Sequence, residues 1–538
     1  MITRACSVLL ALVLLVAGCT SVSPSAQALA ASPTVASSAA TSVLGQWAAE
    51  ETAAPTETPV PTPNPAPPAL PPEIERQTPA LLPAAVGDLV GSSAWDRYTI
   101  IAALSTSDLS VRGTLTLDLV NRYDTPLNRL YFHLYPNHPD FGGRLDITSA
   151  AVDGVPVPSG TQRGDTLFYL ELGTPLAQGA TAHVVLGFKA KTPRSASNDT
   201  FGAYNFEAGV WSLANFYPVL ARYFPGSGWD TRQIESRGDF VVSSVALYDV
   251  TLDAPTGWTL VSSGVTIGDS PVNEQVHRQR FVSGPQREFY LGALQGLSSA
   301  EKVVDGTRIV VHFQPRHAEA GQAGLAIAER SLRAFNARYG TYPLAELEVV
   351  EAALTQFLGM EYPGVVLIEQ DLYAGVDRDL ETTIAHEIAH QWWYSQVGND
   401  AQGEPWLDEG MASYAQVVYY EQAGAPQQAE AELQSFRDIF RRARAGGRDA
   451  PLGASSAQLG GGRYYPVIYA KAPLFIYALR RQIGEQSFER FLHAYYSTAR
   501  YKDIVGADLL RVAQESCGCD LTGLYNDWVL TTTTVAIP

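Results

Sequence analysis

The sequence is poor in cysteine, in basic residues and in long hydrophobic runs, and each shortage excludes a class of protein. Four cysteines in 538 residues are too few for a fold that depends on a disulfide framework. With 37 basic residues against 55 acidic ones, the formal net charge of -18 argues against binding to a phosphate backbone. We therefore expect no nucleic-acid partner. The apolar run at residues 8–17 is too short to serve as a membrane-spanning anchor.

The first residues have the pattern of an export signal. Arg4 precedes the apolar run Val8–Ala17, which has the length of a signal-peptide core. The residues Val16-Ala17-Gly18-Cys19 resemble a bacterial lipobox, which implies that residues 1–19 form a lipoprotein signal and that Cys19 is acylated. Acyl chains bury enough apolar surface for durable attachment, so we expect an exported, membrane-anchored protein facing the cell surface or the periplasm. The alternative is an ordinary secretory signal in which Cys19 is incidental.

Two cysteines remain on this interpretation, because Cys6 lies in the signal and Cys19 carries the lipid. Cys517-Gly518-Cys519 either closes a small ring or stays reduced. The pair lacks two of the four ligands that a structural zinc site needs, so we assign no metal to it.

Residues 20–94 are rich in Ser, Thr, Ala and Pro, with proline densest between Pro55 and Pro83. Such a composition cannot bury a hydrophobic core. We expect a disordered linker that acts as an extended tether, with a proline motif for a partner protein as the alternative.

Residues 95–314 show the alternation of half-buried β-strands. Leu115, Leu117 and Leu119 alternate with polar residues, and similar runs separated by Gly, Pro and Asp turns follow. No internal repeat is present. The pattern predicts an all-β domain.

The clearest chemical motif is His386-Glu387-Ile388-Ala389-His390. On a helix, residues four apart project from one face, so His386 and His390 can hold one metal ion. Glu387 lies one position on, where its carboxylate can take a proton from a metal-bound water instead of ligating the metal. Glu409, in the first turn of a second predicted helix, is the candidate third ligand. Two His and one Glu with an open fourth position are typical of a catalytic zinc site, so we expect one zinc ion per chain.

A loop upstream of this motif connects the sequence to a known family. Gly359-Met360-Glu361 resembles the Gly-x-Met-Glu-Asn substrate loop of the M1 family of zinc aminopeptidases, with Tyr362 in place of Asn. The zinc motif and its third ligand resemble that family as well. The resemblance implies that Gly359, Met360 and Glu361 bind a peptide substrate and that Glu361 pairs with its free α-amino group. A surface acid in a Gly/Pro turn is the alternative for Glu361.

A third motif, Tyr469-Ala470-Lys471, resembles the Tyr-x-Lys around the catalytic tyrosine of the same family. The resemblance implies that Tyr469 donates a hydrogen bond to the oxyanion of the tetrahedral intermediate. Chemistry alone does not single it out, because Tyr464, Tyr465 and Tyr477 are close in sequence.

The resemblance covers the chain from about residue 95 to the C-terminus and implies its fold class. We expect an α+β multidomain protein in which the N-terminal all-β domain, 95–314, is followed by a thermolysin-like mixed α/β zinc metallopeptidase domain, 315–538. Within the second domain, Ala318–Tyr339 is a predicted helix and Val365–Ile368 a predicted edge strand. The sequence resembles a short form of the family without the helical C-terminal domain of larger members.

Asp408 and Asn215–Pro218 each allow two interpretations. Asp408 is a candidate partner for the second nitrogen of a ligating imidazole, or an acid that only favours the helix dipole. Asn215–Pro218 lies where the family has Phe-Pro-x-x-Asp-Glu-Pro near the substrate, but it lacks the Asp-Glu-Pro. An aromatic turn packed on the catalytic domain is the alternative.

The expected function is a zinc-dependent aminopeptidase that hydrolyses the N-terminal peptide bond of peptides. A thermolysin-type endopeptidase shares the zinc chemistry, and a non-enzymatic surface lipoprotein is the third possibility. The substrate loop and the tyrosine motif favour the aminopeptidase over the endopeptidase.

Overall fold

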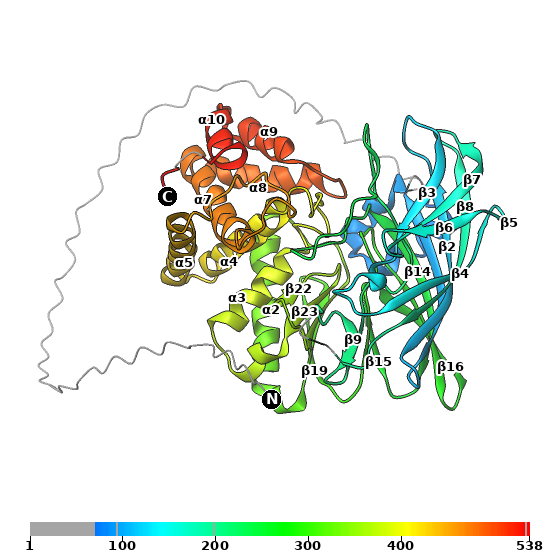
Figure 1. Ribbon diagram of the computed structural model, residues 1–538. Helices are drawn as coiled ribbons and strands as arrows, with labels where there is room; N and C mark the ends of the chain where they lie inside the picture. Colours follow the sequence, from blue (N-terminus) through cyan, green and yellow to red (C-terminus); the bar gives the residue numbers. More distant parts are fainter. Residues whose placement is uncertain (1–69, 93–94, 196, 198–199, 533–534) are drawn as a thin grey trace, which may run out of the picture. The chain divides into compact units, whose positions relative to one another are not determined.

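The computed structural model describes residues 70–92, 95–195, 197, 200–532 and 535–538 (Figure 1). The predicted signal 1–19 with Cys19, and residues 20–69, 93 and 94 of the predicted linker, lie outside the described residues. Those interpretations remain predictions. Within the described ranges, no helix combines the length and apolar character of a membrane span.

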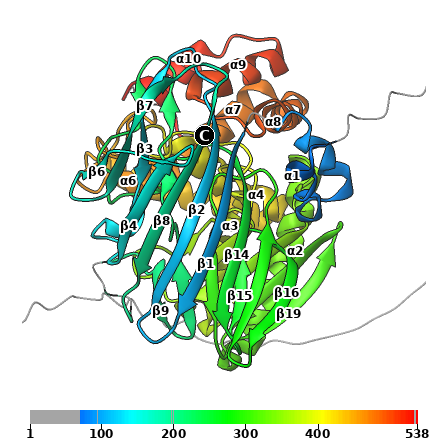
Figure 2. The same cartoon turned by 90° about the vertical axis from the view of Figure 1, so that its right-hand side faces the viewer.

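An eight-stranded sheet forms the outer layer of the β region, and Figure 2 shows its central strands side by side. Strands β1 and β2 alternate buried and exposed positions: Ile100 is fully buried, whereas its neighbour Ile101 is 59% exposed. One face of the sheet therefore covers a core. The strands in spatial order are β16 (Val265–Asn273), β17 (Val276–Val282), β14 (Ala246–Pro255), β1 (Asp96–Ser105), β2 (Ser110–Val120), β8 (Thr181–Lys191), β4 (Arg144–Val152) and β5 (Val155–Pro156).

Two four-stranded sheets and a short ribbon share the core of this layer. Leu130 and Trp211, one from each four-stranded sheet, are fully buried in the same hydrophobic cluster. The first sheet contains β15 (Thr259–Ser262), β18 (Leu291–Leu294), β10 (Val210–Leu213) and β9 (Tyr204–Glu207). The second contains β11 (Val219–Leu220), β3 (Leu127–His133), β7 (Leu167–Leu176) and β6 (Ser159–Gln162), and the ribbon pairs β12 (Tyr223–Phe224) with β13 (Gly228–Trp229).

A mixed five-stranded sheet joins the β region to the helices. Its order is β19 (Ser298–Val304), β20 (Thr307–Phe313), β21 (Glu346–Ala352), β23 (Val365–Glu369) and β22 (Gly359–Met360). Strands β20, β21 and β23 run parallel. The predicted domain boundary at residue 314 is too late, since β19 and β20 precede it. The strand predicted at Val365–Ile368 is present as β23, but its predicted position at the edge of the sheet is wrong, because β22 pairs with its outer side.

Strand β21 is buried on both faces. Leu347 and Val349 belong to the hydrophobic cluster of the helical region, whereas Val350 and Ala352 belong to that of the β region. The strand also buries two carboxylates, and each has a partner: Glu348 pairs with His312 and Glu351 with His317, both at 2.8 Å. The sheet therefore lies between the two cores and contributes to each.

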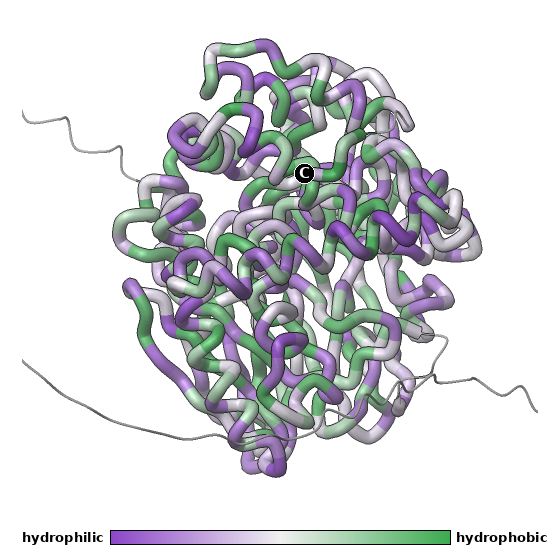
Figure 3. Tube along the Cα trace, turned by 90° about the vertical axis from the view of Figure 1, so that its left-hand side faces the viewer, coloured by the Kyte–Doolittle hydropathy of each residue, from purple (hydrophilic) through white to green (hydrophobic). Residues whose placement is uncertain are grey.

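Helices cover the other side of the mixed sheet (Figure 1). Green and purple stretches alternate along them in Figure 3, as expected for helices with one face on a core. The helices are α2 (Ala318–Arg338), α3 (Arg378–Ala389), α4 (Trp406–Gln422), α5 (Pro426–Ala445), α6 (Tyr464–Pro466), α7 (Ala472–Ile483), α8 (Glu485–Ala499), α9 (Gly506–Cys517) and α10 (Thr522–Tyr525), with π-helical turns at Val467–Lys471 and Asn526–Leu530. Cys517 and Cys519 form a disulfide at the end of α9.

Residues 70–92, which we name the strap, are folded, contrary to the predicted disordered linker. The strap contains α1 (Pro72–Glu75) and 3-10 turns at Thr78–Ala80 and Pro83–Leu89. Ile74 and Leu89 are each only 1% exposed and belong to the core of the helical region. The proline-rich composition indicated a disordered linker, because these apolar residues contact their partners only in the folded chain.

Polar contacts fix the strap at both ends. Arg76 forms an ion pair of 3.1 Å with Asp249 of β14. Asp88 accepts a hydrogen bond of 2.9 Å from the hydroxyl of Tyr501 and pairs with Arg500. The strap thus contacts both the large β-sheet and the segment that follows α8.

Removal of one buried strap side chain should destabilise the whole fold. Leu81 is 5% exposed and forms a β-bridge with Leu344. We expect Leu81→Ala to lower the free energy of unfolding by about 2–4 kcal/mol, because it leaves a cavity in the core. Urea unfolding would measure the change. Val90→Ala is the control, since Val90 is 44% exposed and its truncation should change stability by less than about 0.5 kcal/mol. Equal stability of the wild type and Leu81→Ala would contradict an anchoring role.

Candidate metal centre

Helix α3 places the two histidines of the motif on one buried face. The helix begins after Asp377, whose carboxylate accepts hydrogen bonds from the backbone N–H groups of Asp379 and Leu380. His386 lies in the last turn and His390 caps the helix, and their exposures are only 8% and 1%. Their Nε2 atoms approach to 3.1 Å.

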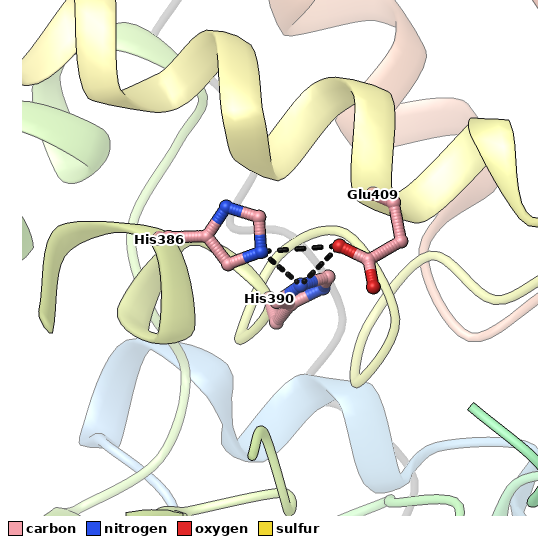
Figure 4. Close-up of side chains that lie close together, drawn as sticks. All are labelled: His386, His390 and Glu409. Carbon is pink, nitrogen blue, oxygen red and sulfur yellow. Dashed lines mark hydrogen bonds and ion pairs between the residues drawn. The ribbon is translucent and has the colours of Figure 1, made fainter. Parts of the chain in front are cut away.

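Glu409 of α4 completes the group, and Figure 4 shows the three side chains pointing toward one another. Its Oε2 lies 3.1 Å from Nε2 of His386 and 3.4 Å from Nε2 of His390. Ligand atoms about 2.0–2.1 Å from a tetrahedral zinc ion lie roughly 3.3 Å apart, so these separations fit zinc. The three predicted ligands therefore converge, and their number leaves a coordination position for water or substrate.

The second imidazole nitrogens have partners other than the predicted one. Nδ1 of His390 lies 2.9 Å from the carbonyl oxygen of Trp393, and Nδ1 of His386 lies 3.3 Å from the side-chain amide of Gln416. Asp408 instead accepts a hydrogen bond of 2.9 Å from the backbone N–H of Glu409. The prediction that Asp408 orients a ligating imidazole is therefore wrong, since this carboxylate turns back onto the first turn of its own helix.

Glu387 lies beside the ligands and against the substrate loop. A Cβ atom added at Gly359 would lie 2.3 Å from Oε1 of Glu387, so only glycine allows this approach. Burial, with the charges of Glu409 and Asp239 in addition, raises the pKa of the Glu387 carboxyl to about 8. A base with a pKa near neutrality both accepts and returns a proton efficiently.

Glu361 connects the metal group to a small acidic cavity. Carboxylate oxygens of Glu361 and Glu387 and a ring nitrogen of His390 all lie within 4.8 Å of one another. The cavity has a volume of about 10 Å³, which is enough for one group of the size of water or ammonium. Its lining comprises Asp239, Phe240, Val241, Glu288, Met360, Glu361, Tyr362 and Tyr394.

Asp239 is a site residue that the sequence analysis missed. Its carboxyl lies in hydrogen-bonding contact with that of Glu361. Burial raises the pKa of Asp239 to about 7, helped by the charge of Glu409, and raises that of Glu361 well above its ordinary value, helped by Asp239. A cation placed between these two adjacent carboxyls would favour their ionised forms. Glu288 differs, because its carboxylate already accepts hydrogen bonds from Asn215 and Tyr394.

The segment that carries Asp239, residues 230–241, is fixed to the helical region, and we name it the inserted segment. Arg232 pairs with Asp400 at 2.8 Å. The side chain of Gln402 donates to the carbonyl oxygen of Asp239 at 2.6 Å and accepts from the backbone N–H of Glu235 at 3.0 Å. No local sequence pattern marks Asp239, since it reaches the site only through these contacts with distant residues.

Gly238 lets the inserted segment approach the metal centre closely. A Cβ atom there would lie 1.7 Å from the hydroxyl oxygen of Tyr464, and its φ of +66° is in the left-handed region. Asn215, by contrast, is buried with Phe216 and Tyr217 in the β core, so the alternative of an aromatic turn describes Asn215–Pro218 better than substrate contact does.

Tyr469 is the tyrosine that contacts the metal group. Its hydroxyl donates to Oε1 of Glu409, and its ring centroid lies 6.0 Å from that of His386. The oxygen of Glu409 that faces the histidines is the other one, Oε2. Tyr469 therefore lies beside the centre without displacing a ligand atom.

The other candidate tyrosines have different environments. Tyr464 has a buried hydroxyl with no hydrogen-bond partner among the described residues, and Tyr465 is 59% exposed. Tyr477 packs under the guanidinium of Arg437. Tyr362, which replaces the family's Asn, stacks on Tyr290 with 4.5 Å between ring centroids and so packs into the β core.

Comparison with protein families agrees with this centre. Residues 324–528 match the model of the peptidase family M1 domain, a range that includes the three ligands, Glu387, Glu361 and Tyr469. This part of the chain is therefore similar to the M1 peptidase domain. The remaining contributor to the site, Asp239, lies outside the matched range.

The curated proteins to which the chain is similar include aminopeptidases. Aminopeptidase N of Lactococcus lactis subsp. lactis is 26% identical over 310 residues, which cover 53% of this chain and 36% of that protein. Aminopeptidase B of Mus musculus is 28% identical over 273 residues, covering 49% and 41%. The chain thus spans about two fifths of the length of these relatives.

Solved M1 structures show the same fold. The M1 zinc metallopeptidase of Deinococcus radiodurans is similar with a TM-score of 0.63 and 20% identity, covering 82% of this chain and 95% of that one. A mutant of that peptidase with a bound Tyr-Ser-Ala substrate has a TM-score of 0.62 at 20% identity and the same coverage. The predicted fold class, an α+β protein with β-sheets followed by a mixed sheet and helices, is confirmed.

Substitution of a metal ligand should remove zinc from the protein, whereas substitution of the proton acceptor should not. His386→Ala or Glu409→Ala should lose stoichiometric zinc, because each removes one of three protein ligands. Glu387→Gln should retain zinc, since Glu387 is the proton acceptor and not a ligand, and its kcat should fall by several orders of magnitude. Metal analysis of the purified variants measures the first effect, and a peptidase assay the second. Loss of zinc from Glu387→Gln would make Glu387 a ligand.

Proposed function

We propose that the protein is a zinc-dependent aminopeptidase that removes the first residue of peptides. The observation that carries this proposal is the ammonium-sized acidic cavity beside the metal group, with Glu361 bordering both. A free α-ammonium fits two adjacent carboxyls through charge-assisted hydrogen bonds. A peptide bound by its amino end in so small a cavity presents its first peptide bond to the metal.

Each residue then has a defined role. His386, His390 and Glu409 hold zinc, which, when bound, activates water and polarises the scissile carbonyl. Glu387 accepts the proton of the attacking water and returns it to the leaving amine. Tyr469, whose hydroxyl already lies at Glu409, donates a hydrogen bond to the developing oxyanion.

The raised pKa values of Asp239 and Glu361 favour an ammonium as the bound group. Burial raises the pKa of both carboxyls, and the charge of Asp239 raises that of Glu361 further, because two negative charges so close together repel. An ammonium between them would offset that repulsion and favour the ionised pair. The aminopeptidase names of the relatives and the tripeptide bound to the Deinococcus structure agree with this substrate class.

A thermolysin-type endopeptidase is the second candidate, because it uses the same zinc chemistry. The acidic cavity argues against it, since an internal peptide segment has no cation to place between Asp239 and Glu361. A non-enzymatic binding protein is the third, and the presence of the ligands, Glu387 and Tyr469 in one buried group argues against it.

Asp239 and Glu361 should control recognition of the substrate's amino end. We expect Glu361→Gln and Asp239→Asn each to raise KM for aminoacyl amides at least tenfold with zinc content unchanged, because each removes a carboxylate from the ammonium site. N-acetylated peptides should be poor substrates of the wild type. Steady-state kinetics on matched free and acetylated peptides measures both effects.

Glu235→Gln is the matched control, since Glu235 belongs to the inserted segment but its side chain pairs with Arg237 outside the cavity. Its KM should equal that of the wild type. Efficient cleavage by the wild type inside an acetylated peptide would contradict the aminopeptidase proposal and favour the endopeptidase.

We also propose that the enzyme is a membrane-anchored lipoprotein exported to the cell surface or the periplasm. The proposal rests on the lipobox-like residues before Cys19 and on the length of the preceding apolar run. Cys19→Ser should move the protein from the membrane fraction to the soluble fraction with unchanged kcat. Fractionation and mass spectrometry of the N-terminus are the measurements. A mature N-terminus well downstream of Cys19 on membrane-bound protein would overturn the proposal.

A further inference from the structure

Tyr469 lies in a π-helical turn, Val467–Lys471, between α6 and α7. The backbone N–H of Ala472 donates to the carbonyl of Val467, five residues back, so this turn contains one residue more than an α-helical turn. One extra residue rotates the preceding side chains by about 100° around the helix axis. The π turn therefore decides which way Tyr469 points, and π turns often occur at functional sites for this reason.

Lys471, the last residue of the same turn, is completely buried. Its Nζ donates hydrogen bonds to Oδ1 of Asp449 at 2.8 Å and to the carbonyl oxygen of Ala450 at 2.7 Å. The Nζ also lies 5.6 Å from the centre of the Phe440 ring of α5. A buried ammonium without its carboxylate is strongly disfavoured, so Lys471 has little freedom to leave Asp449.

The two side chains point in roughly opposite directions, because residues two apart on a helical turn lie on opposite sides of it. Tyr469 contacts Glu409, whereas Lys471 contacts the loop that carries Asp449. That loop is itself fixed, since the backbone N–H of Gly453 donates to the carbonyl of Val529 at 2.9 Å. The π turn is thus held between the metal group on one side and a fixed loop on the other.

We infer that Lys471 is a positioning residue: its buried pair with Asp449 holds the π turn in the register that directs the Tyr469 hydroxyl toward the metal centre. The inference rests on the proposed function for the role of Tyr469. Lys471 acts through Tyr469 alone, because its described partners lie in the loop and in α5 and not in the acidic cavity.

Lys471→Met tests this by kinetics. We expect kcat to fall about 10²-fold, as for a catalytic group displaced by about 1 Å, with KM and zinc content unchanged. In a Tyr469→Phe background, Lys471→Met should reduce kcat by less than twofold, because the group that it positions is already absent. Full additivity of the two substitutions, or an unchanged kcat in Lys471→Met, would overturn the inference.

Asp449→Asn is a milder variant that keeps a hydrogen-bond acceptor and serves if Lys471→Met fails to fold. Asp449→Asn should also lower kcat, and in the Tyr469→Phe background it should change kcat by less than twofold. Asp249→Asn is the matched control, since Asp249 is a largely buried carboxylate paired with Arg76 and Arg280 far from the π turn. Its kcat should equal that of the wild type.

A crystal structure of Asp449→Asn or Lys471→Met provides a readout that does not need turnover. We expect the N–H of Ala472 to transfer from the carbonyl of Val467 to that of Ile468, and the Tyr469 hydroxyl to leave Glu409. An unchanged π turn would overturn the inference, whatever the substrate. Absence of peptidase turnover in the wild type would instead overturn the proposed function.

Discussion

The centre depends on a local excess of buried negative charge. The carboxyl groups of Asp239, Glu361, Glu387, Asp408 and Glu409 affect one another's ionisation, and Glu409 contacts both histidines. Burial raises the pKa of four of these carboxyls, Asp239, Glu361, Glu387 and Asp408. Glu409 is the exception, since its hydrogen bonds to His386 and His390 outweigh burial and lower its pKa. On the proposed function, a divalent metal at the histidines and a substrate ammonium at Asp239 and Glu361 would offset this charge.

This charge cluster is assembled from both sides of the mixed five-stranded sheet. Helices α3 and α4 supply the metal ligands, β22 and the loop after it supply Glu361, and the inserted segment brings Asp239 from the β region. The β region is therefore part of the candidate site and not only a neighbour of the helices that carry the ligands. Because the sheet contributes strands to both hydrophobic cores, the two halves of the site are held in a fixed relation.

The sequence predicted the site residues that lie close together in the chain, but not those whose positions depend on contacts with distant residues. His386, Glu387 and His390 lie within one helical turn, so spacing alone predicts their common face, and Glu409 follows from the start of the next helix. Asp239 and the strap escaped prediction because their positions are set by contacts with residues far away in the chain. For Asp408 the sequence left two interpretations open for a related reason: it showed that Asp408 adjoins a ligand, but not that its carboxylate turns back to its own helix backbone. The boundary at residue 314 failed because β19 and β20 alternate like strands of the β region yet pair with β21.

The shared sheet also defines the smallest piece of the chain that can be expected to fold. A fragment starting at residue 315 would contain every metal ligand but would leave the β20 side of β21 without a hydrogen-bonding partner. An unpaired apolar strand edge is a template for intermolecular pairing, so such a fragment would aggregate rather than bind zinc. A fragment starting at residue 95 would retain the sheet but lose Ile74, Leu81 and Leu89 from the helical core. Recombinant work on this protein therefore has its natural starting point at or before residue 70.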